Sequence, residues 1–241
     1  MNNKKKKKIV IFGLNNTGLK IYKELKKKNK FKIKLITKNN YSKKFIFNFS
    51  PDFIFSLGYR KKIDPVVLRY AKSGSFNLHK SLLPLHSGAN PIFWTILNNT
   101  PAGHTIHKMN DKIDAGEIIL QKKVRYDFSF DARELYEKVE KEQIKDFFKF
   151  IERPNFYLKR LKKNKFNKKN YHFIKNFKKF KKVNFFSQKK YWNTISLLRA
   201  LNFKPFNNII FKINRKLFSV SIKIDNIKEL KKKNYDRINE Y

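Results

Sequence analysis

The chain has 241 residues, which is enough for one sizeable hydrophobic core and a small appendage but short for two full enzyme domains. It contains no cysteine, which excludes a disulfide scaffold and thiol catalysis and agrees with a reducing compartment such as the cytoplasm. Lys and Arg number 58 against 18 Asp and Glu, for a formal net charge of +40, so an acidic or neutral surface is excluded.

The positive charge has two interpretations. It is typical of proteins that bind nucleic acid or an anionic membrane. However, Lys, Asn, Ile, Phe and Tyr all have codons rich in A and T, so a genomic base bias would produce the same composition. We favour the base bias, because the lysines are spread along the whole chain instead of forming one stripe. Nucleic acid therefore stays an open but disfavoured partner.

The first half of the chain has the pattern of a parallel α/β sheet. The elements expected in chain order are a strand at 9–14, a helix at 17–28, strands at 31–36 and 52–57, a helix at 65–71 and a strand at 75–79. Strands that alternate with helices are typical of such a sheet. The turn GLNNTG at 13–18 lacks both the three-glycine fingerprint and a P-loop lysine, so we assign no nucleotide to it.

The second half continues with shorter elements and one long helix. The pattern predicts a helix at 92–97, strands at 104–109 and 117–124 around a turn at 113–116, and a helix at 131–150. From 151 to 190 basic residues crowd together without a clean period, which indicates a linker or a loosely packed arm. A helix at 191–201 and a hairpin of strands at 209–213 and 217–224 follow.

No apolar stretch is long enough to span a bilayer. The apolar run after the basic residues 1–8 is too short for a signal peptide core, so we expect no leader.

Two polar side chains are expected to share one face of the strand at 75–79. Side chains alternate along a strand, so Asn77 and His79 point the same way while Phe76 and Leu78 pack behind them. Open α/β sheets place their sites at the carboxyl ends of their strands. A histidine at a strand end can also simply cap a loop, and the strand alone leaves both possibilities open.

Asp114 lies in a turn between two apolar runs. An Asp shortly before a glycine is commonly a turn former that bonds its own backbone, and this alternative stays open from the turn alone. His104 and His107 flank the segment, but their spacing does not match a zinc site and no third ligand is evident. We therefore expect no metal.

The stretch from Gly58 to Val124 resembles the catalytic core of enzymes that take a formyl group from N10-formyltetrahydrofolate. It contains NLHKSLLPLHSGANPIFW and then AGHTIHKMNDKIDAGEIILQKKV. The ordered matches to the family pattern are Asn77, His79, Ser81 to Pro84, Gly88, Pro91, Thr105, His107 and Ile113 to Gly116. One departure is His86-Ser87-Gly88, because many members have a basic residue just before the glycine. Any phosphate contact made by that residue is therefore in doubt.

The resemblance implies roles for the three polar residues. Asn77 donates to the formyl oxygen, His79 polarises the tetrahedral intermediate or accepts the proton of the amine, and Asp114 orients His79 and relays the proton. The residues implied to bind the folate are Tyr59, Arg60, Ser81, Leu82, Leu83, Pro84, Ala115 and Gly116. The residues expected to contact the acceptor are Lys80, Gly88, Asn90, Tyr191 and Trp192, of which the last two could stack on a nucleotide base.

The resemblance also narrows the acceptor. Methionyl-tRNA formyltransferases carry a C-terminal barrel domain, for which the residues after 190 are too few. The segment LRALNFKPFNN at 198–208 is similar to one in the short sugar N-formyltransferases. An ordinary amphipathic helix followed by a turn would show the same sequence pattern. We therefore expect formyl transfer to a nucleotide-linked amino-dideoxy sugar, with dTDP as the nucleotide, for surface glycan biosynthesis in the cytoplasm.

The expected fold class is α/β, with a Rossmann-like formyltransferase domain and a mostly parallel sheet over 1–150. A basic arm or linker over 151–190 and a small C-terminal helix and β-hairpin region over 191–241 follow, with the hairpin helping to form a homodimer. The alternatives are a methionyl-tRNA formyltransferase-like enzyme and a basic RNA-binding protein on a formyltransferase fold.

Overall fold

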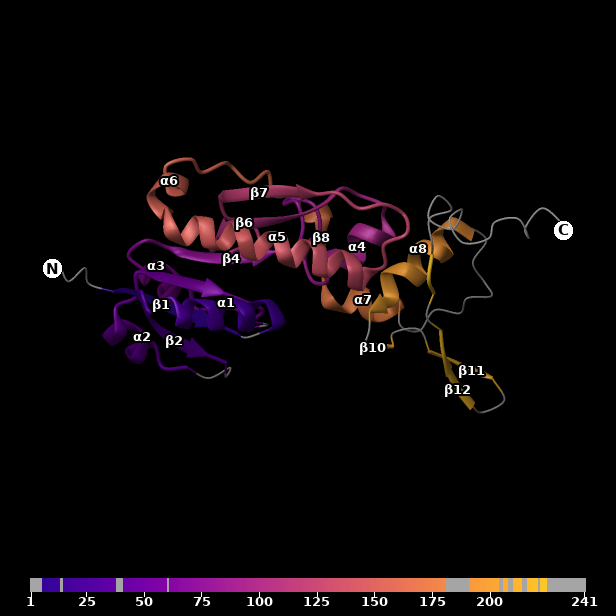
Figure 1. Cartoon of the computed structure of the whole chain (residues 1–241), viewed down its shortest axis with the longest axis horizontal. Coiled ribbons are helices and arrows are strands. Elements are labelled where there is room, and N and C mark those ends of the chain that lie inside the picture. Colours follow the sequence, from indigo (N-terminus) through magenta and orange to yellow (C-terminus); the bar gives the residue numbers. More distant parts are fainter. Residues whose placement is uncertain are drawn as a thin grey trace.

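The computed structural model shows an elongated molecule with a central sheet near its N-terminal end (Figure 1). The residues that it describes are 6–13, 15–37, 41–59, 61–180, 191–203, 206–207, 210–213, 216–220 and 222–224. Within these ranges, only the backbone is described for 179–180, for 191–193 and for the residues between 206 and 218.

The central sheet has six strands in the order β2-β1-β3-β4-β6-β7. Its strands are β1 (Lys7–Phe12), β2 (Phe31–Ile36), β3 (Phe53–Ser56), β4 (Ser75–His79), β6 (Ala102–Lys108) and β7 (Ile118–Val124). The pairs among β1 to β4 are parallel, whereas β6 and β7 are antiparallel additions. The predicted mostly parallel α/β sheet is confirmed.

Alternation along the buried strands builds one core on each face of the sheet. Ile9 and Ile11 of β1 face a core shared with α1 (Asn16–Lys27) and α5 (Ala132–Glu152). Val10 and Phe12 face the opposite core, which includes residues of α2 (Lys43–Phe49) and α3 (Pro65–Tyr70). A strand buried on both faces is continuously apolar, which is why the sequence IVIF carries no polar alternation.

Helix α5 is the longest element and lies along the sheet (Figure 1). It begins after Asp131, whose side chain accepts from the Glu134 backbone N–H at 2.8 Å while Glu134 reaches back to the Asp131 N–H at 2.9 Å. This reciprocal capping box confirms the helix start predicted from the sequence. Near its other end, Phe147 and Phe150 pack edge-on against Phe55 and Phe76, and each buried ring contributes roughly 2–3 kcal/mol of hydrophobic free energy.

The first strand turns into α1 at Gly13, where the backbone is left-handed with φ of 77°. A Cβ atom at this position would lie 2.4 Å from the backbone nitrogen of Tyr59. The glycine is therefore needed for the close approach of two strand-end loops. This supports the interpretation of GLNNTG as a structural turn.

The segment after α5 is more ordered than the predicted linker or loosely packed arm. It forms the elements α6 (Pro154–Leu158), a 3-10 turn (Lys168–Asn170), β8 (Tyr171–His172) and α7 (Ile174–Phe180). The strand β8 pairs with β5 (Ser87–Gly88) in the loop after β4. The lysines described in this segment are exposed to solvent, and they interrupt any helical or strand period in the sequence. The sequence pattern therefore did not indicate the backbone pairing of β8 with β5.

The C-terminal part of the chain contains α8 (Tyr191–Leu201), the short pair β9 (Asn202–Phe203) and β10 (Phe206–Asn207), and a hairpin of β11 (Ile210–Ile213) and β12 (Lys216–Ser219). The predicted helix and hairpin are confirmed, with a shorter second strand. Helix α8 shares a core with α4 (Pro91–Leu97) and the first turns of α5. The domain boundaries at 150 and 190 remain predictions.

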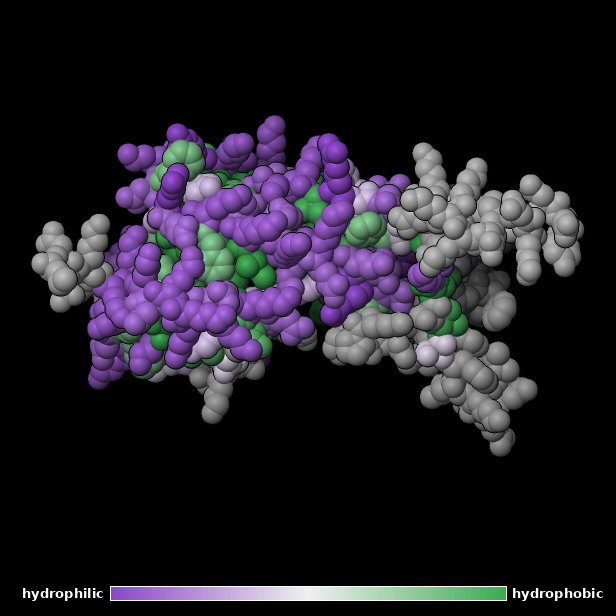
Figure 2. Space-filling model, viewed as in Figure 1, coloured by the Kyte–Doolittle hydropathy of each residue, from purple (hydrophilic) through white to green (hydrophobic). Residues whose placement is uncertain are grey.

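Hydrophilic side chains cover much of the face shown in Figure 2. Exposed lysines lie on separate elements, such as Lys32 and Lys34 on β2 and Lys122 and Lys123 on β7.

Among the helices that the structure describes, none combines the length and apolar character needed to cross a membrane.

Candidate functional site

Asn77 and His79 lie on β4 and point to the same side of it, as the alternation predicted. In the register with β6, Asn77 stands opposite His107 and His79 stands opposite Thr105. The antiparallel neighbour therefore adds His107 to the face that carries Asn77. His79 and His107 are only 6% and 1% exposed, so the cluster is formed from buried polar groups.

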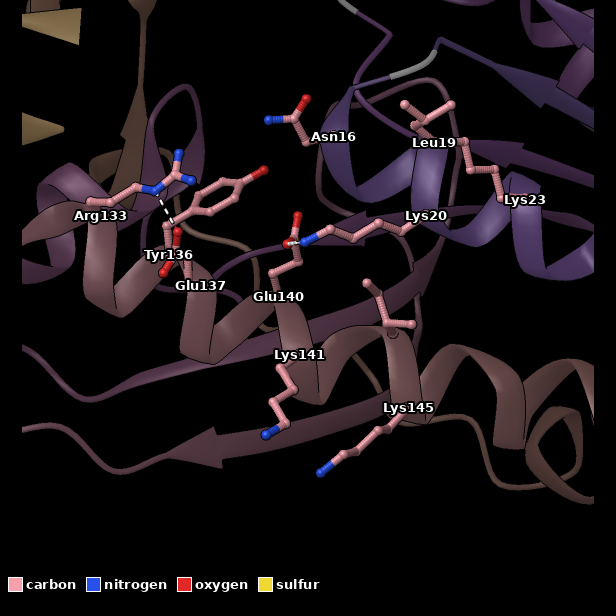
Figure 3. A pocket seen from close by; sticks show the side chains of 11 residues that line it. Asn16, Leu19, Lys20, Lys23, Arg133, Tyr136, Glu137, Glu140, Lys141 and Lys145 are labelled. Carbon is pink, nitrogen blue, oxygen red and sulfur yellow. Dashed lines mark hydrogen bonds and ion pairs between the residues drawn. The ribbon is translucent and has the colours of Figure 1, made fainter. Parts of the chain in front are cut away.

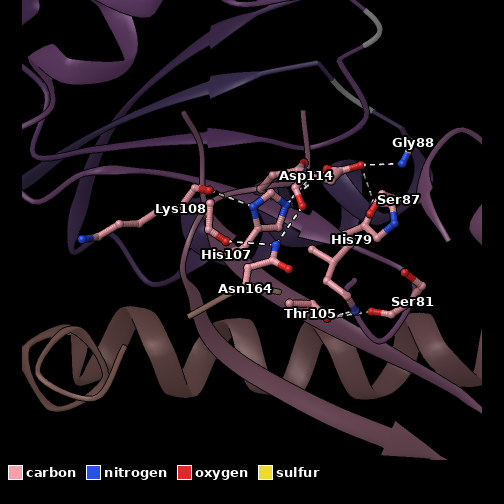
Figure 4. Close-up of polar contacts among 12 residues, drawn as sticks. His79, Ser81, Ser87, Gly88, Thr105, His107, Lys108, Asp114 and Asn164 are labelled. Carbon is pink, nitrogen blue, oxygen red and sulfur yellow. Dashed lines mark hydrogen bonds and ion pairs between the residues drawn. The ribbon is translucent and has the colours of Figure 1, made fainter. Parts of the chain in front are cut away.

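Asp114 reaches this face from the turn between β6 and β7 (Figure 4). Its Oδ1 lies 3.3 Å from Asn77 Nδ2 and 3.3 Å from His107 Nε2, and its Oδ2 lies 3.5 Å from His79 Nδ1. The backbone N–H of Gly88 donates to Oδ2 at 2.8 Å. The structure thus brings Asp114 to Asn77 and His79, although it lies more than 30 residues after them in the sequence.

Both imidazole rings use one nitrogen to donate to a backbone carbonyl. His79 Nε2 donates to the His86 carbonyl at 2.9 Å, and His107 Nδ1 donates to the Lys108 carbonyl at 2.8 Å. In a neutral imidazole only one nitrogen carries a proton, so in neutral His79 the Nδ1 atom that faces Asp114 is a free base. A proton taken up at His79 Nδ1 would be held between that nitrogen and the carboxylate.

The electrostatics of the cluster keep Asp114 ionised and leave His79 neutral before the reaction. Burial alone would raise the pKa of Asp114, but the facing His79 and His107 rings and the Gly88 N–H hold the pKa well below its usual range. Burial lowers the pKa of His79, and the charge of Asp114 only partly opposes this. At neutral pH the carboxylate is therefore ionised and His79 is neutral, which is the state needed to accept a proton.

The loop 81–88 packs against β6 and closes one side of the cluster. The Ser81 hydroxyl donates to the Leu85 carbonyl at 2.6 Å, and the Ser81 carbonyl accepts from the Thr105 hydroxyl at 2.7 Å. Leu82 and Leu83 are 8% and 3% exposed. Ser87, which stands where many relatives have a basic residue, is fully buried, so its side chain does not replace that residue at the surface.

The other predicted site residues lie in several different places in the fold. Tyr59 follows β3 and packs edge-on against Phe12, with ring centroids 5.3 Å apart. Asn90 precedes α4 in a left-handed conformation, and its amide nitrogen is buried without a hydrogen-bond partner within the described part of the chain. Ala115 and Gly116 belong to the Asp114 turn. Arg60 lies outside the described residues, as do the side chains of Tyr191 and Trp192 in α8.

Lys80 is not brought to the cluster. Its Nζ points to the helical side of the sheet, where it donates to the Thr17 hydroxyl at 2.8 Å and to Gln143 Oε1 at 3.3 Å. Beyond Thr17 lies a pocket of about 830 Å³ between α1 and α5, in which Lys20 and Glu140 form an ion pair (Figure 3). The predicted contact of Lys80 with substrate has no support in this placement.

The burial of Lys80 predicts a pH-dependent stability. Desolvation lowers the pKa of Lys80 to about 8, so the charged amine costs the folded state free energy below pH 8, and this cost disappears as pH approaches 10.5. The cost at neutral pH is on the order of 3 kcal/mol. Relative to Lys80→Met, the wild type should therefore gain free energy of unfolding between pH 7.5 and pH 10, measured by urea denaturation. A difference between the two proteins that is the same at both pH values would contradict this assignment.

Two residues of the site, Asn164 and His172, were not singled out by the sequence. His172 of β8 stacks on Trp94, with ring centroids 4.0 Å apart, and its Nε2 lies 3.2 Å from His86 Nδ1. Asn164 donates to the carbonyl oxygens of Asp114 and Gly116. No sequence signal marks Asn164 or His172, because both lie in the segment that showed no period.

Comparisons with known proteins show the family to which the chain is similar. A model of the family described as formyl transferase matches residues 5–151, more than half of the chain. GDP-perosamine N-formyltransferase from Brucella melitensis is 39% identical over 92 residues, which are 38% of this chain and 36% of that protein. The chain thus aligns with only about a third of that curated relative.

Two solved structures have similar folds. A 4-N formyltransferase from Francisella tularensis superposes with a TM-score of 0.76 at 23% identity, over 91% of this chain and 98% of that one. The formyltransferase PseJ from Anoxybacillus kamchatkensis, in complex with UDP-4,6-dideoxy-4-formamido-L-AltNAc and tetrahydrofolate, gives a TM-score of 0.60 at 27% identity, over 80% of this chain and 98% of that one.

Proposed function

Because the chain belongs to the formyl transferase family, we propose that it transfers a formyl group from N10-formyltetrahydrofolate to the amine of a nucleotide-linked amino sugar. The observation that carries the proposal is the cluster of Asn77, His79 and Asp114, with the carboxylate 3.3 Å from the amide and 3.5 Å from the imidazole. Formyl transfer requires a donor to a carbonyl oxygen and an acceptor for a proton, and the cluster contains one of each.

The side chains present fit a formylated folate. The Asn77 amide supplies hydrogen-bond donors, and the loops after β3 and β4 contain the buried apolar residues Leu57, Leu82 and Leu83. The residues proposed to hold the folate are Tyr59, Ser81, Leu82, Leu83, Pro84, Ala115 and Gly116, with Arg60 as a further candidate. When it is bound, N10-formyltetrahydrofolate supplies the carbonyl group that the amine attacks.

Each residue of the cluster has a separate task in the proposed reaction. Asn77 turns an amide hydrogen toward the carbonyl oxygen as negative charge develops there. His79 accepts the proton of the attacking amine at Nδ1, because its Nε2 proton is engaged with the His86 carbonyl, and would give a proton to the folate nitrogen that leaves as the donor C–N bond breaks. Asp114 stabilises the imidazolium that forms, and its ion pair with His79 stays buried away from water. His107 holds Asp114 from the other side.

The acceptor class is supported by the relatives. The names of similar proteins refer to GDP-perosamine, to a 4-N formyltransferase and to a UDP-linked formamido sugar. Another solved structure with a similar fold, from Helicobacter canadensis, contains folinic acid and dTDP-3-aminofucose. We propose a dTDP-linked 3-amino- or 4-amino-dideoxy sugar as the acceptor, Gly88 and Asn90 as residues that contact it, and surface glycan synthesis as the use of the product. A homodimer remains a prediction.

The purified full chain should transfer a formyl group to a nucleotide-linked amino sugar and not to methionyl-tRNA. The test supplies N10-formyltetrahydrofolate with dTDP-, GDP- and UDP-linked amino sugars in parallel, and follows the formamido product by mass spectrometry. Methionyl-tRNA is offered in a separate reaction. Transfer to methionyl-tRNA alone would show that the acceptor is the transfer RNA and not an amino sugar. Salt-dependent RNA binding without any transfer would instead show a binding protein built on this fold.

A further inference from the structure

The segment from Lys162 to His172, here called the brace, contacts both loops that surround Asp114. At its start, Lys162 and Ile118 exchange two backbone hydrogen bonds of 2.8 Å each. At its end, β8 pairs with β5, and the Ala89 N–H donates to the His172 carbonyl at 2.8 Å. The brace therefore runs from the turn that carries Asp114 to the loop that carries Gly88.

Asn164, within the brace, holds the Asp114 turn. Its Nδ2 donates to the Asp114 carbonyl at 2.8 Å and to the Gly116 carbonyl at 3.2 Å. The turn itself is weakly held, because its Ala115 to Lys112 backbone bond is 3.4 Å long and Asp114 has a left-handed φ of 54°. A left-handed residue other than glycine persists only where its surroundings hold it. One amide group thus fixes the carbonyls on both sides of Ala115.

The other atom of the Asn164 amide indicates why the residue is there. Its Oδ1 is buried and finds no hydrogen-bond partner among the residues that the structure describes. A buried acceptor without a partner lowers stability. Asn164 is therefore a poor choice for stability alone, and its contribution lies in the two bonds that it donates to the turn.

The end of the brace holds the second partner of Asp114. Gly88 donates its backbone N–H to Asp114 Oδ2 at 2.8 Å, and a Cβ atom on Gly88 would lie 2.4 Å from the His172 carbonyl oxygen. The pairing of β8 with β5 thus places the N–H that the carboxylate accepts. The brace therefore holds Asp114 at two places: Asn164 binds the backbone carbonyl of Asp114, and the β8–β5 pairing places the Gly88 N–H that binds its carboxylate.

We propose that Asn164 is a positioning residue for formyl transfer, which keeps the Asp114 carboxylate beside His79 by holding the carbonyls of the Asp114 turn. This inference rests on the proposed function. Among the described residues, Asn164 forms no hydrogen bond with His79 or Asn77. It therefore acts through the turn that carries Asp114. A misplacement of about 1 Å in a catalytic group can cost about a hundredfold in rate, so a loosened turn has a measurable effect.

The first test is Asn164→Ala with Asn167→Ala as its matched control. Asn167 lies in the same segment and is exposed, and its side chain accepts a local bond from Lys169 at 2.9 Å, away from the cluster. Asn164→Ala is expected to lower kcat by about 10- to 100-fold with KM changed by less than about threefold, while Asn167→Ala stays within about twofold of wild type. If Asn164→Ala does not fold, Asn164→Ser, which keeps one donor, replaces it with a smaller expected loss.

The second test separates positioning from general structure. In an Asp114→Asn background, Asn164→Ala should lower the residual rate by less than about threefold, because its target is already removed. A purely structural role would lower the rate by the same factor in both backgrounds. An equal loss in both backgrounds would overturn the inference.

The third test needs no substrate. The chain has only five histidines, so NMR of protein labelled with ¹⁵N-histidine can follow the ring of His79 through a pH titration. Because Asp114 raises the pKa of His79, Asn164→Ala should lower that pKa relative to wild type and to Asn167→Ala. An unchanged pKa together with an unchanged kcat would refute the role of Asn164. A wild-type protein that transfers no formyl group would instead refute the proposed function, whichever result the titration gives.

Discussion

Asp114→Asn is expected to lower kcat for formyl transfer by about 10²- to 10⁴-fold. The amide has nearly the shape of the carboxylate but no charge, so it cannot stabilise a proton at His79 Nδ1, 3.5 Å away. The asparagine side chain of the variant would also face the Gly88 N–H and the Asn77 amide, both of which donate hydrogen bonds to the Asp114 carboxylate of the wild type. The measurement is the steady-state rate with a saturating amino sugar and N10-formyltetrahydrofolate, together with the melting temperature of each protein.

The matched control for this variant is Asp111→Asn. Asp111 lies three residues away, is well exposed and, within the described part of the chain, forms an ion pair with Arg69 at 3.3 Å. An exposed ion pair contributes about 0–1 kcal/mol, so this change should leave both rate and stability near the wild-type values. His79→Asn should resemble Asp114→Asn, because the two residues act as a unit. Turnover within about threefold of wild type in Asp114→Asn would remove the proposed proton path.

Gly116→Ala is expected to destabilise the protein by at least about 3 kcal/mol and to abolish the geometry of the Asp114 turn. A Cβ atom at Gly116 would lie 1.9 Å from the carbonyl oxygen of Lys108, which is a backbone atom and cannot rotate away. The chain must move either β6 or the turn, and the turn carries Asp114. We therefore expect a fall in the free energy of unfolding, measured by urea denaturation, together with a loss of formyl transfer.

Lys112→Ala is the control for the glycine variant. Lys112 is exposed in the same turn, and its backbone N–H donates to Asn110 Oδ1 at 3.0 Å, a bond that alanine retains. Its free energy of unfolding should change by less than about 0.5 kcal/mol. Wild-type stability in Gly116→Ala would show that the close approach of Lys108 and Gly116 is not required for folding.

The cluster of Asn77, His79 and Asp114 was predictable because each member carries a local signal. Asn77 and His79 share a strand face through simple alternation, and Asp114 stands in a turn marked by the glycine after it. Their roles, however, came from the resemblance to a family, since a strand-end histidine or a turn aspartate is commonly structural. The local pattern also located β3, β4 and α5 closely, because buried phenylalanines and a capping box are strong signals.

The brace was not predictable in the same way, whereas strand alternation could already have indicated the direction of Lys80. Asn164 lies 50 residues from Asp114 and has only lysines and a phenylalanine as neighbours, so no period or motif marks it. Lys80 directly follows His79, and the alternation that turns His79 to the cluster turns Lys80 to Thr17 and Gln143. The resemblance had led us to expect that Lys80 contacts the acceptor, but the neighbouring helices α1 and α5 bury its amine.

By itself the sequence determined the alternating strands, the helix caps, the hairpin and the identity of the three polar residues, because these features depend on neighbours within a few positions along the chain. Only the tertiary structure decided how β6 adds His107 opposite Asn77, how Gly88 and Asn164 hold the carboxylate and its turn, and to which backbone carbonyls the two imidazoles donate. Those contacts join residues tens of positions apart, and their distances and burial set the pKa values of His79 and Asp114.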